Sequence, residues 1–214
     1  MGEKEGVIKY QLHHQHCQLD AGQDVSELNA WRTLLYRLQL IGRIPEKYDG
    51  LSYGNISRRL VPGSEQFLIS GSQTGHMPEL NRLHYALIHQ ASPQQNTIYS
   101  SGLTQPSSEA LTHAGVYQQN ADIQAVIHVH SPELWYGTQS LHLPSIAANI
   151  AYGTPEMAQA VAELFVSGQL QSVGIFSMLG HEDGVVAFGP SLSAAACVLI
   201  EQLANAIAIQ SALH

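Results

Sequence analysis

The pattern of hydrophobic and polar positions in this 214-residue chain predicts alternating helices and strands. Between residues 26 and 41 apolar side chains recur every three or four positions, which is typical of one buried face of a helix. Gly42 is expected to end that helix. Short strands are expected at residues 54–60 and 66–69, because a Pro-Gly-Ser turn separates two extended apolar segments there.

The rest of the chain continues this alternation. Ser108 is expected to cap a helix, and Thr154 with Pro155 is expected to open another. The predicted elements are a hairpin over residues 85–99, a helix over 108–120, a strand over 125–130, a helical turn from 132, a helix over 154–166, strands over 173–179 and 185–188, and a helix over 191–212. The order predicts an α/β fold with a mixed central sheet.

Composition limits the organisation and the partners. With 44% hydrophobic and 12% charged residues, the chain is expected to form one domain over residues 23–214, preceded by a polar, irregular N-terminal arm over 1–22. The net charge of −8, with nine Lys plus Arg, offers no basic surface for a nucleic acid. A small-molecule substrate is therefore expected, and no nucleic-acid partner.

Cysteine usage and hydropathy give an expected compartment. Cys17 and Cys197 lie far apart and form no CxxC pair, which favours a reducing environment. The first residues contain no apolar stretch typical of a signal peptide, and no other stretch is expected to reach membrane-spanning length. We expect a cytoplasmic protein that does not interact with a membrane.

The sequence Ile-His-Val-His-Ser at residues 127–131 indicates a metal site. Alternate residues of a strand share a face, so His128 and His130 point the same way, and Ile127 and Val129 point into the opposite layer. Imidazole nitrogens suit Zn²⁺ and similar ions. His181, in a turn between Gly180 and Gly184, is the best candidate for a third ligand. Twelve histidines leave a second interpretation open, in which the pair in the strand is not a ligand set.

Glu109 is the candidate acid or base. At the start of a helix its carboxylate meets the positive end of the helix dipole, and beside a divalent ion it could exchange a proton with a substrate. The alternative is a glutamate that only stabilises the first helical turn.

Three turns predict an anion site. Residues 53–57 and 70–75 are rich in glycine and hydroxyl groups, and Ser107 and Ser108 precede a helix. Backbone N–H and hydroxyl groups of this kind can surround a phosphate. None of the three matches a nucleotide-binding loop, and each of them alone is explained as a turn with no ligand. Three such turns in one chain with a suspected metal site indicate a phosphorylated small substrate.

The chain resembles the class II aldolase/adducin family over roughly residue 26 to the end. The segments that support the resemblance are Gly54-Asn55-Ile56-Ser57, Thr74-Gly75, Pro106-Ser107-Ser108-Glu109 with His113 and Tyr117, His128-Val129-His130-Ser131, Tyr152-Gly153-Thr154-Pro155-Glu156, and His181 with Gly184 and Gly189. The resemblance implies a three-layer α/β/α fold and a homotetramer.

The resemblance also implies roles for the candidate residues. His128, His130 and His181 would bind one divalent metal, most simply Zn²⁺, with Mn²⁺, Co²⁺ or Fe²⁺ as alternatives, and Glu109 would be the acid/base residue. The residues expected to line the phosphate site are Gly54, Asn55, Thr74, Gly75, Ser107 and Ser108. The implied reaction is aldolase-type cleavage of a ketose phosphate, or a related hydroxy-carbonyl compound, through a metal-stabilised enediolate.

Lysine positions favour this metal route over a Schiff base. A Schiff-base aldolase needs a buried lysine, and Lys4, Lys9 and Lys47 all lie outside the proposed site segments.

Two departures from the family pattern keep other functions open. Asn149 stands where the aldolases of this family carry a tyrosine that donates a proton, and Gly180 and Glu182 flank His181 where the family has Asn and Gly. Epimerisation, dehydration or decarboxylation of a sugar phosphate would use the same metal site. A non-catalytic, adducin-like assembly domain is the alternative of another class, although such domains lose the metal ligands.

The N-terminal arm contains a further group, His13, His14, His16 and Cys17. No further ligands follow at the spacing of a metal site, so we expect adventitious metal binding or a solvated arm rather than a built metal site.

Overall fold

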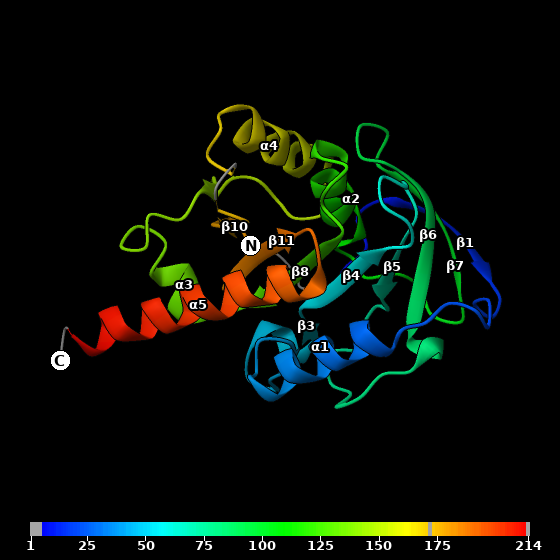
Figure 1. Cartoon of the computed structure of the whole chain (residues 1–214), viewed down its shortest axis with the longest axis horizontal. Coiled ribbons are helices and arrows are strands. Elements are labelled where there is room, and N and C mark those ends of the chain that lie inside the picture. The colour runs from blue at the N-terminus through cyan, green and yellow to red at the C-terminus, as the bar shows by residue number, and fades with distance from the viewer. Residues whose placement is uncertain (1–5, 171–172, 213–214) are drawn as a thin grey trace.

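The structure is a computed structural model that describes residues 6–170 and 173–212. Within these residues a mixed β-sheet runs through the middle of the molecule, and helices cover both of its faces (Figure 1). The α/β class predicted from the sequence is therefore confirmed, as is the three-layer arrangement.

Nine strands of the described residues form the main sheet in the order β1-β7-β6-β5-β4-β8-β11-β10-β9. The strands are β1 (Gln11–His16), β4 (Asn55–Arg59), β5 (Phe67–Ser70), β6 (Tyr85–Ser92), β7 (Thr97–Gly102), β8 (Ala125–His130), β9 (Ser145–Ile146), β10 (Ile175–Met178) and β11 (Gly184–Gly189). A separate pair is β2 (Gly42–Arg43) with β3 (Ser52–Tyr53). Strands β1 and β7 pair in parallel, as do β9 and β10, and the remaining neighbours are antiparallel.

The helices divide between the two faces. Helices α2 (Ala110–Gln119) and α4 (Pro155–Val166) pack on one face, and α1 (Ser26–Arg37), α3 (Pro132–Tyr136) and α5 (Leu192–Ser211) pack on the other (Figure 1). In β8, Val126 belongs to the core with α2 and α4, whereas Ile127 and Val129 belong to the core with α1, α3 and α5. The alternation predicted for this strand is confirmed, and it turns His128 and His130 toward the α2 side.

The first 22 residues, predicted to be an irregular arm, contain a strand. Residues Gln11–His16 form β1, an edge strand paired with β7 over its whole length, and Tyr10 and Leu19 are buried. Periodicity missed this strand because an edge strand can keep polar side chains on both faces. His13 stacks on Tyr99 with ring centroids 4.6 Å apart, and His14 lies within hydrogen-bond distance of Ser100 and Gly102. The expected irregular structure is therefore wrong for β1, whereas its side chains are exposed or half-buried, as expected for a solvated arm.

Two predicted helix boundaries are also wrong. Helix α1 ends at Arg37 rather than near Gly42, because Gln39 adopts a left-handed φ of 60° and the next two residues turn into the core. Glu109, not Ser108, is the N-cap of α2, and the Ser107 hydroxyl accepts the backbone N–H of Glu109.

Helix α5 reaches membrane-spanning length, contrary to the expectation that no apolar stretch would do so. It has 20 residues and a mean hydropathy of 1.7 in its most apolar window, so by length and composition it could cross a bilayer. Its first half packs against the sheet through Leu192, Ala195 and Leu199, as the core helix of a globular domain does. The second half extends beyond the body of the molecule (Figure 1).

Candidate metal centre

Strand β8 places two histidines in the interior of the sheet. His128 lies opposite Asn55 of β4 and Val186 of β11, and His130 lies opposite Gly184 at the end of the same β11 pairing. Both histidine side chains are buried. The neighbouring strands on either side therefore hold the two imidazoles rigidly on one face.

His181 reaches the same point from the turn between β10 and β11. Its Nε2 atom lies 3.0 Å from Nε2 of His130, and the ligand atoms of all three histidines lie within 4.8 Å of one another. Gly184 makes room for this imidazole, because a Cβ atom there would stand 2.4 Å from Cδ2 of His181. The position of the His181 imidazole therefore requires glycine at residue 184.

The hydrogen bonds and burial of the imidazoles favour a metal-binding state. Nδ1 of His128 lies 3.2 Å from the Val185 carbonyl, which can only accept, so this nitrogen carries the proton and Nε2 keeps its lone pair. Within the described residues, Nε2 of His128 has no hydrogen-bond partner. Burial, followed by the charge of His181, holds the pKa of both His128 and His130 well below the ordinary value, so both are neutral.

Glu109 faces this group from the start of α2. Its Oε1 atom lies 3.6 Å from Nε2 of His181 and 3.9 Å from Nε2 of His128, and the side chain is fully buried. The sequence separates these residues by up to 72 positions, yet the fold brings all four together.

The donor set fits a divalent metal ion. Tetrahedral zinc sites place imidazole nitrogens roughly 2.0–2.1 Å from the ion, which separates two such nitrogens by roughly 3.3 Å. The 3.0 Å spacing of His130 and His181 is close to that value. Three imidazoles with a carboxylate beside them would leave a position open for a substrate oxygen.

The six residues predicted to bind phosphate line one small cavity, which we call the anion pocket. Its other lining residues are Gly6, Ser52, Gly71, Ser72 and Gln73, and none of these eleven residues carries a charge. Asn55 connects the pocket to the histidines because it pairs with His128, and Ser108 connects it to Glu109. Within the described residues Oδ1 of Asn55 is buried without a partner, which suits an incoming ligand.

A buried arginine that the sequence pattern did not single out lies behind the anion pocket. Arg32 of α1 donates to the carbonyls of Thr74 and Gly75 at 2.9 Å each and to the carbonyl of Met77. Its side chain is 1% exposed, and no carboxylate in the described part of the chain pairs with it. Arg32 therefore fixes the Thr74–Gly75 turn and adds positive charge behind it. The signal in the sequence was a charged residue on the apolar side of a helix.

A second group missed from the sequence stands beside His130. Tyr48 donates to Oδ2 of Asp183 at 2.5 Å, and its ring lies 4.5 Å from that of His130. Lys47 pairs with the same oxygen at 3.3 Å. Tyr48, Asp49 and Asp183 all adopt left-handed φ angles, a strained backbone that is enriched at functional sites.

Lysines therefore stand closer to the histidines than the sequence indicated. Lys47 is 43% exposed and paired with an acid, and Lys9 lies over the Tyr152 ring at 3.6 Å. Lys47 is not the buried amine that a Schiff base needs. Its position therefore does not weaken the preference for a metal route over a Schiff-base route.

A buried polar chain supports the metal strand from behind. The Ser57 hydroxyl lies 2.7 Å from Nδ1 of His113 and 2.8 Å from the hydroxyl of Tyr117. Burial lowers the pKa of His113 to about 3. Ser57 belongs to β4, and His113 and Tyr117 belong to α2. These hydrogen bonds therefore hold α2, which begins after Glu109, against β4, the strand that pairs with β8.

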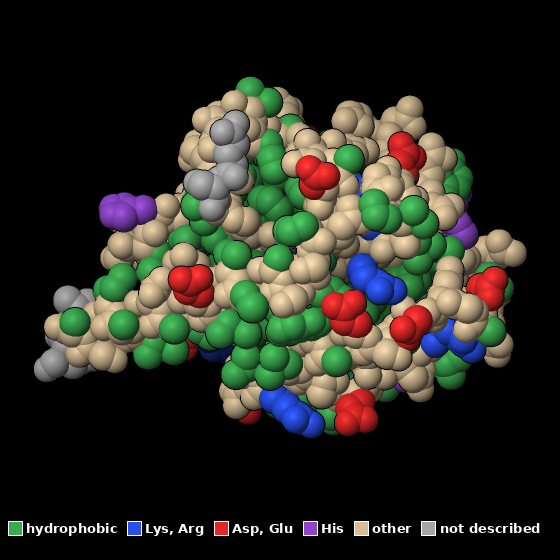
Figure 2. All heavy atoms as spheres, viewed as in Figure 1, with side chains coloured by type: hydrophobic (Ala, Val, Ile, Leu, Met, Phe, Trp, Pro, Cys, Tyr) green, Lys and Arg blue, Asp and Glu red, His purple; other side chains and the backbone are tan. Residues whose placement is uncertain are grey.

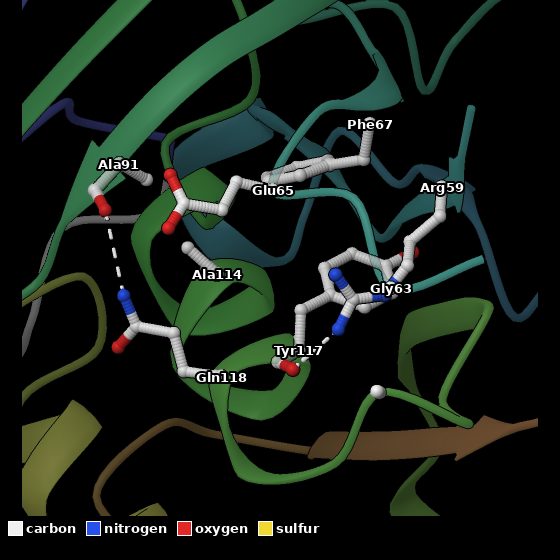
Figure 3. Close-up of a pocket in the computed structure, with 9 residues that line it drawn as sticks. Arg59, Gly63, Glu65, Phe67, Ala91, Ala114, Tyr117 and Gln118 are labelled. Carbon is white, nitrogen blue, oxygen red and sulfur yellow. Dashed lines mark hydrogen bonds between the residues drawn. The ribbon is translucent and has the colours of Figure 1, made fainter. Parts of the chain in front are cut away.

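A second cavity of about 240 Å³ lies on the far side of Tyr117 and contains no predicted site residue (Figure 3). Arg59 is one of its lining residues, and its N–H groups donate to the carbonyls of Ser64, Tyr117, Asn120 and Ile123. Its guanidinium therefore serves the structure of the α2 C-terminus.

The fold and the buried group of three histidines define the class, an α/β protein with residues that could hold a metal ion beside a carboxylate. The model of the Class II Aldolase and Adducin N-terminal domain matches residues 45–211. The chain belongs to this family.

Solved structures share the fold. A sugar-phosphate aldolase from Thermotoga maritima is 18% identical with a TM-score of 0.66, covering 87% of this chain and 93% of that one. L-fuculose-1-phosphate aldolase from Thermus thermophilus is 20% identical with a TM-score of 0.61, covering 86% and 90%. YgbL from Escherichia coli, described as a putative aldolase/epimerase/decarboxylase, is 19% identical with a TM-score of 0.62, covering 86% of each chain. No curated protein sequence matches the chain.

Proposed function

We propose that the chain is a metal-dependent lyase that cleaves a ketose phosphate, or a related hydroxy-carbonyl compound, by aldolase-type chemistry. The observation that supports this most directly is the position of Glu109, whose carboxylate stands 3.6 Å and 3.9 Å from two ligand nitrogens in a buried site. A carboxylate there reaches both the ion and the carbon-bound or oxygen-bound protons of a substrate.

Three groups of residues would bind the metal, move the proton and bind the phosphate. His128, His130 and His181 would hold the ion, which supplies Lewis acidity toward the substrate carbonyl. Glu109 would take the proton of the hydroxyl beside the C–C bond that breaks, so that the carbon bearing this oxygen becomes a carbonyl. It would then return the proton to the carbon on the other side of the broken bond. The anion pocket holds the phosphate through neutral N–H and O–H groups, so the reacting carbons lie between the pocket and Glu109.

Zn²⁺ is the metal we propose, with Mn²⁺, Co²⁺ and Fe²⁺ as alternatives. Three imidazoles suit each of these ions, and the chain supplies no thiolate at the site to select among them, because Cys17 and Cys197 are absent from the group.

A specific observation supports epimerisation or dehydration as the second candidate. Asn149, at the place of the aldolase tyrosine, has no acidic hydroxyl, and it lies exposed in the turn after β9. An epimerase or dehydratase that breaks no C–C bond would use Glu109 and the same three histidines, and would form no aldehyde oxygen that exchanges a proton with a group at that position.

The test is an activity screen of metal-loaded protein over ketose phosphates and their non-phosphorylated counterparts. We expect turnover of a phosphorylated ketose to two carbonyl products, and a loss of at least about 100-fold in kcat for Glu109→Gln. An exposed acid, Glu163→Gln, is the control and should leave kcat unchanged. A single isomeric or dehydrated product would favour the second candidate.

Metal content separates an enzyme from an adducin-like assembly domain. We expect one divalent ion per chain by elemental analysis, and its loss in a His128→Ala, His130→Ala double variant. A protein that holds no stoichiometric ion and binds none of Zn²⁺, Mn²⁺ or Co²⁺ when supplied would contradict the proposal.

We further propose that the chain assembles as a homotetramer. The outer half of α5 supports an interface between copies of the chain, because Ile207 and Ile209 are 49% and 36% exposed on a helix that extends beyond the body of the molecule (Figure 2). The number of four copies is what the family resemblance implies. Apolar surface of this kind on a globular domain commonly marks an interface.

A further inference from the structure

Residues 6–10, which we call the N-terminal segment, lie against the candidate site. Gly6 lines the anion pocket together with residues of three other turns. The buried Tyr10 donates its hydroxyl to the carbonyl of Ser107 at 2.8 Å. Burial raises the pKa of the Tyr10 phenol, and the charge of Glu109 raises it further, so Tyr10 also lies within electrostatic reach of the candidate acid. The segment thus touches the phosphate side of the site.

The same segment reaches the metal side through Tyr152. The Val7 N–H donates to the Tyr152 hydroxyl at 3.1 Å, and that hydroxyl donates to the Val7 carbonyl at 3.3 Å. The ammonium of Lys9 lies 3.6 Å from the centre of the Tyr152 ring. The Tyr152 ring in turn stands edge-on to His181, with centroids 4.6 Å apart. One aromatic ring therefore separates the segment from a candidate ligand.

Strand β1 anchors the segment at this place. The pairing of β1 with β7 starts at Gln11, directly after Tyr10, and the Asn96 side chain donates to the Lys9 carbonyl at 3.0 Å. The segment and its anchor both precede residues 45–211, the part that matches the family.

We propose that the N-terminal segment is a wall of the substrate site and sets its specificity for the anionic group of the substrate. The inference rests on the proposed function, because it gives the anion pocket the role of a phosphate site. Gly6 limits the depth of the pocket, and Tyr10 is a positioning residue that holds the Ser107–Ser108 turn through its carbonyl. A substrate of this class would therefore contact residues that lie outside the family-matched part of the chain.

Gly6→Ala tests the wall directly. Gly6 has a left-handed φ of +68°, and a Cβ atom there would stand 2.1 Å from Nε2 of Gln73. Gln73 cannot move freely, because its Oε1 atom accepts the Ser52 N–H, so alanine displaces either the segment or a residue of the pocket. Gly63→Ala is the matched control, with φ of +74° and an ordinary 3.9 Å approach to Ala121.

The measurement is calorimetric titration of the full metal-loaded chain with inorganic phosphate, with metal content determined for every variant. We expect Gly6→Ala to weaken phosphate binding about tenfold and Tyr10→Phe about threefold. Gly63→Ala should match the unaltered chain, and metal content should stay constant.

The outcomes separate the two proposals. Equal phosphate affinity in Gly6→Ala, Tyr10→Phe and the unaltered chain would overturn the wall alone and leave the anion pocket intact. An unaltered chain that binds no phosphate would overturn the phosphate role in the proposed function, and the wall with it. A loss in Gly63→Ala equal to that in Gly6→Ala would also overturn the wall, because backbone strain would then explain both.

Discussion

At the scale of single residues, burial decides the charge of the histidines. His113 is fully buried, and burial lowers its pKa to about 3 from an ordinary value of 6.5. Below about pH 6.5, His113 is therefore protonated in the unfolded chain but stays neutral in the folded chain. The contribution of His113 to stability is fully present above pH 6.5 and is lost progressively as the pH falls toward 3.

This linkage gives a prediction for metal-free protein. The free energy of unfolding should fall with decreasing pH between 6.5 and 4.5, and His113 should account for about 1.4 kcal/mol per pH unit of that slope. His113→Gln should flatten the slope by that amount, as measured by urea unfolding at a series of pH values. The exposed His142→Gln is the control. A slope that both variants leave unchanged would contradict the assignment of a neutral, buried His113.

Arg32 gives a second prediction at this scale. Its planar guanidinium bonds three carbonyls at once, an arrangement that the single ammonium of lysine does not reproduce. Arg32→Lys should reduce the free energy of unfolding by about 3 kcal/mol and also weaken phosphate binding, because the Thr74–Gly75 turn loses its support. The exposed Arg37→Lys on the same helix should change neither quantity. An Arg32→Lys variant with full stability would show that the carbonyls find other donors.

At the scale of elements, strong periodicity and caps could be predicted from the sequence. Strand β8 occupies the expected residues 125–130, and α4 begins after the predicted Thr154 cap, whose hydroxyl accepts the Met157 N–H. Local signals suffice there because the buried pattern and the cap agree. Strand β1 could not be predicted, since its pairing with β7 joins residues about 86 positions apart and its polar residues leave no period.

The site divides in the same way. The histidines and Glu109 could be predicted as candidates, because ligand chemistry and element ends mark them in the sequence. Arg32, the Tyr48–Asp183 pair and the N-terminal segment could not, since their contacts depend on how α1, the turn near residue 48 and β1 meet the sheet. Tertiary contacts of this kind leave no local pattern.

Helix α5 gives a prediction for an element. Ser191 caps it by accepting the Ala194 N–H at 3.0 Å, and this helix covers the sheet face behind β8 and β11. Ser191→Ala should lower the free energy of unfolding by about 1 kcal/mol, as is typical of a lost cap. Ser193→Ala in the first turn of the same helix provides the control, and thermal or urea unfolding provides the measurement. Equal stability of the two variants would mean that packing, not the cap, fixes the start of α5.

At the scale of the whole molecule, the outer half of α5 is a largely apolar surface that the rest of a single chain does not cover. The second half of the helix extends beyond the body of the molecule (Figure 1). Its last turns contain the exposed Ile207 and Ile209, and Ala206 is the buried residue there. Exposing this much apolar surface is costly in water, so a second copy that covers it would stabilise the fold. Assembly would then be linked to the stability of each chain.

Light scattering after size-exclusion chromatography tests this expectation. The unaltered chain should elute as a species of four times the mass of one chain, and an Ile207→Glu, Ile209→Glu double variant should dissociate, because two carboxylates would be buried in each contact. Val166→Glu is the matched control, since Val166 is 88% exposed at the end of α4 and lies outside the α5 surface. If the double variant kept the mass of the unaltered protein, α5 would not form the interface. If dissociation also abolished turnover while metal content stayed constant, the neighbouring chain would have to contribute to the site.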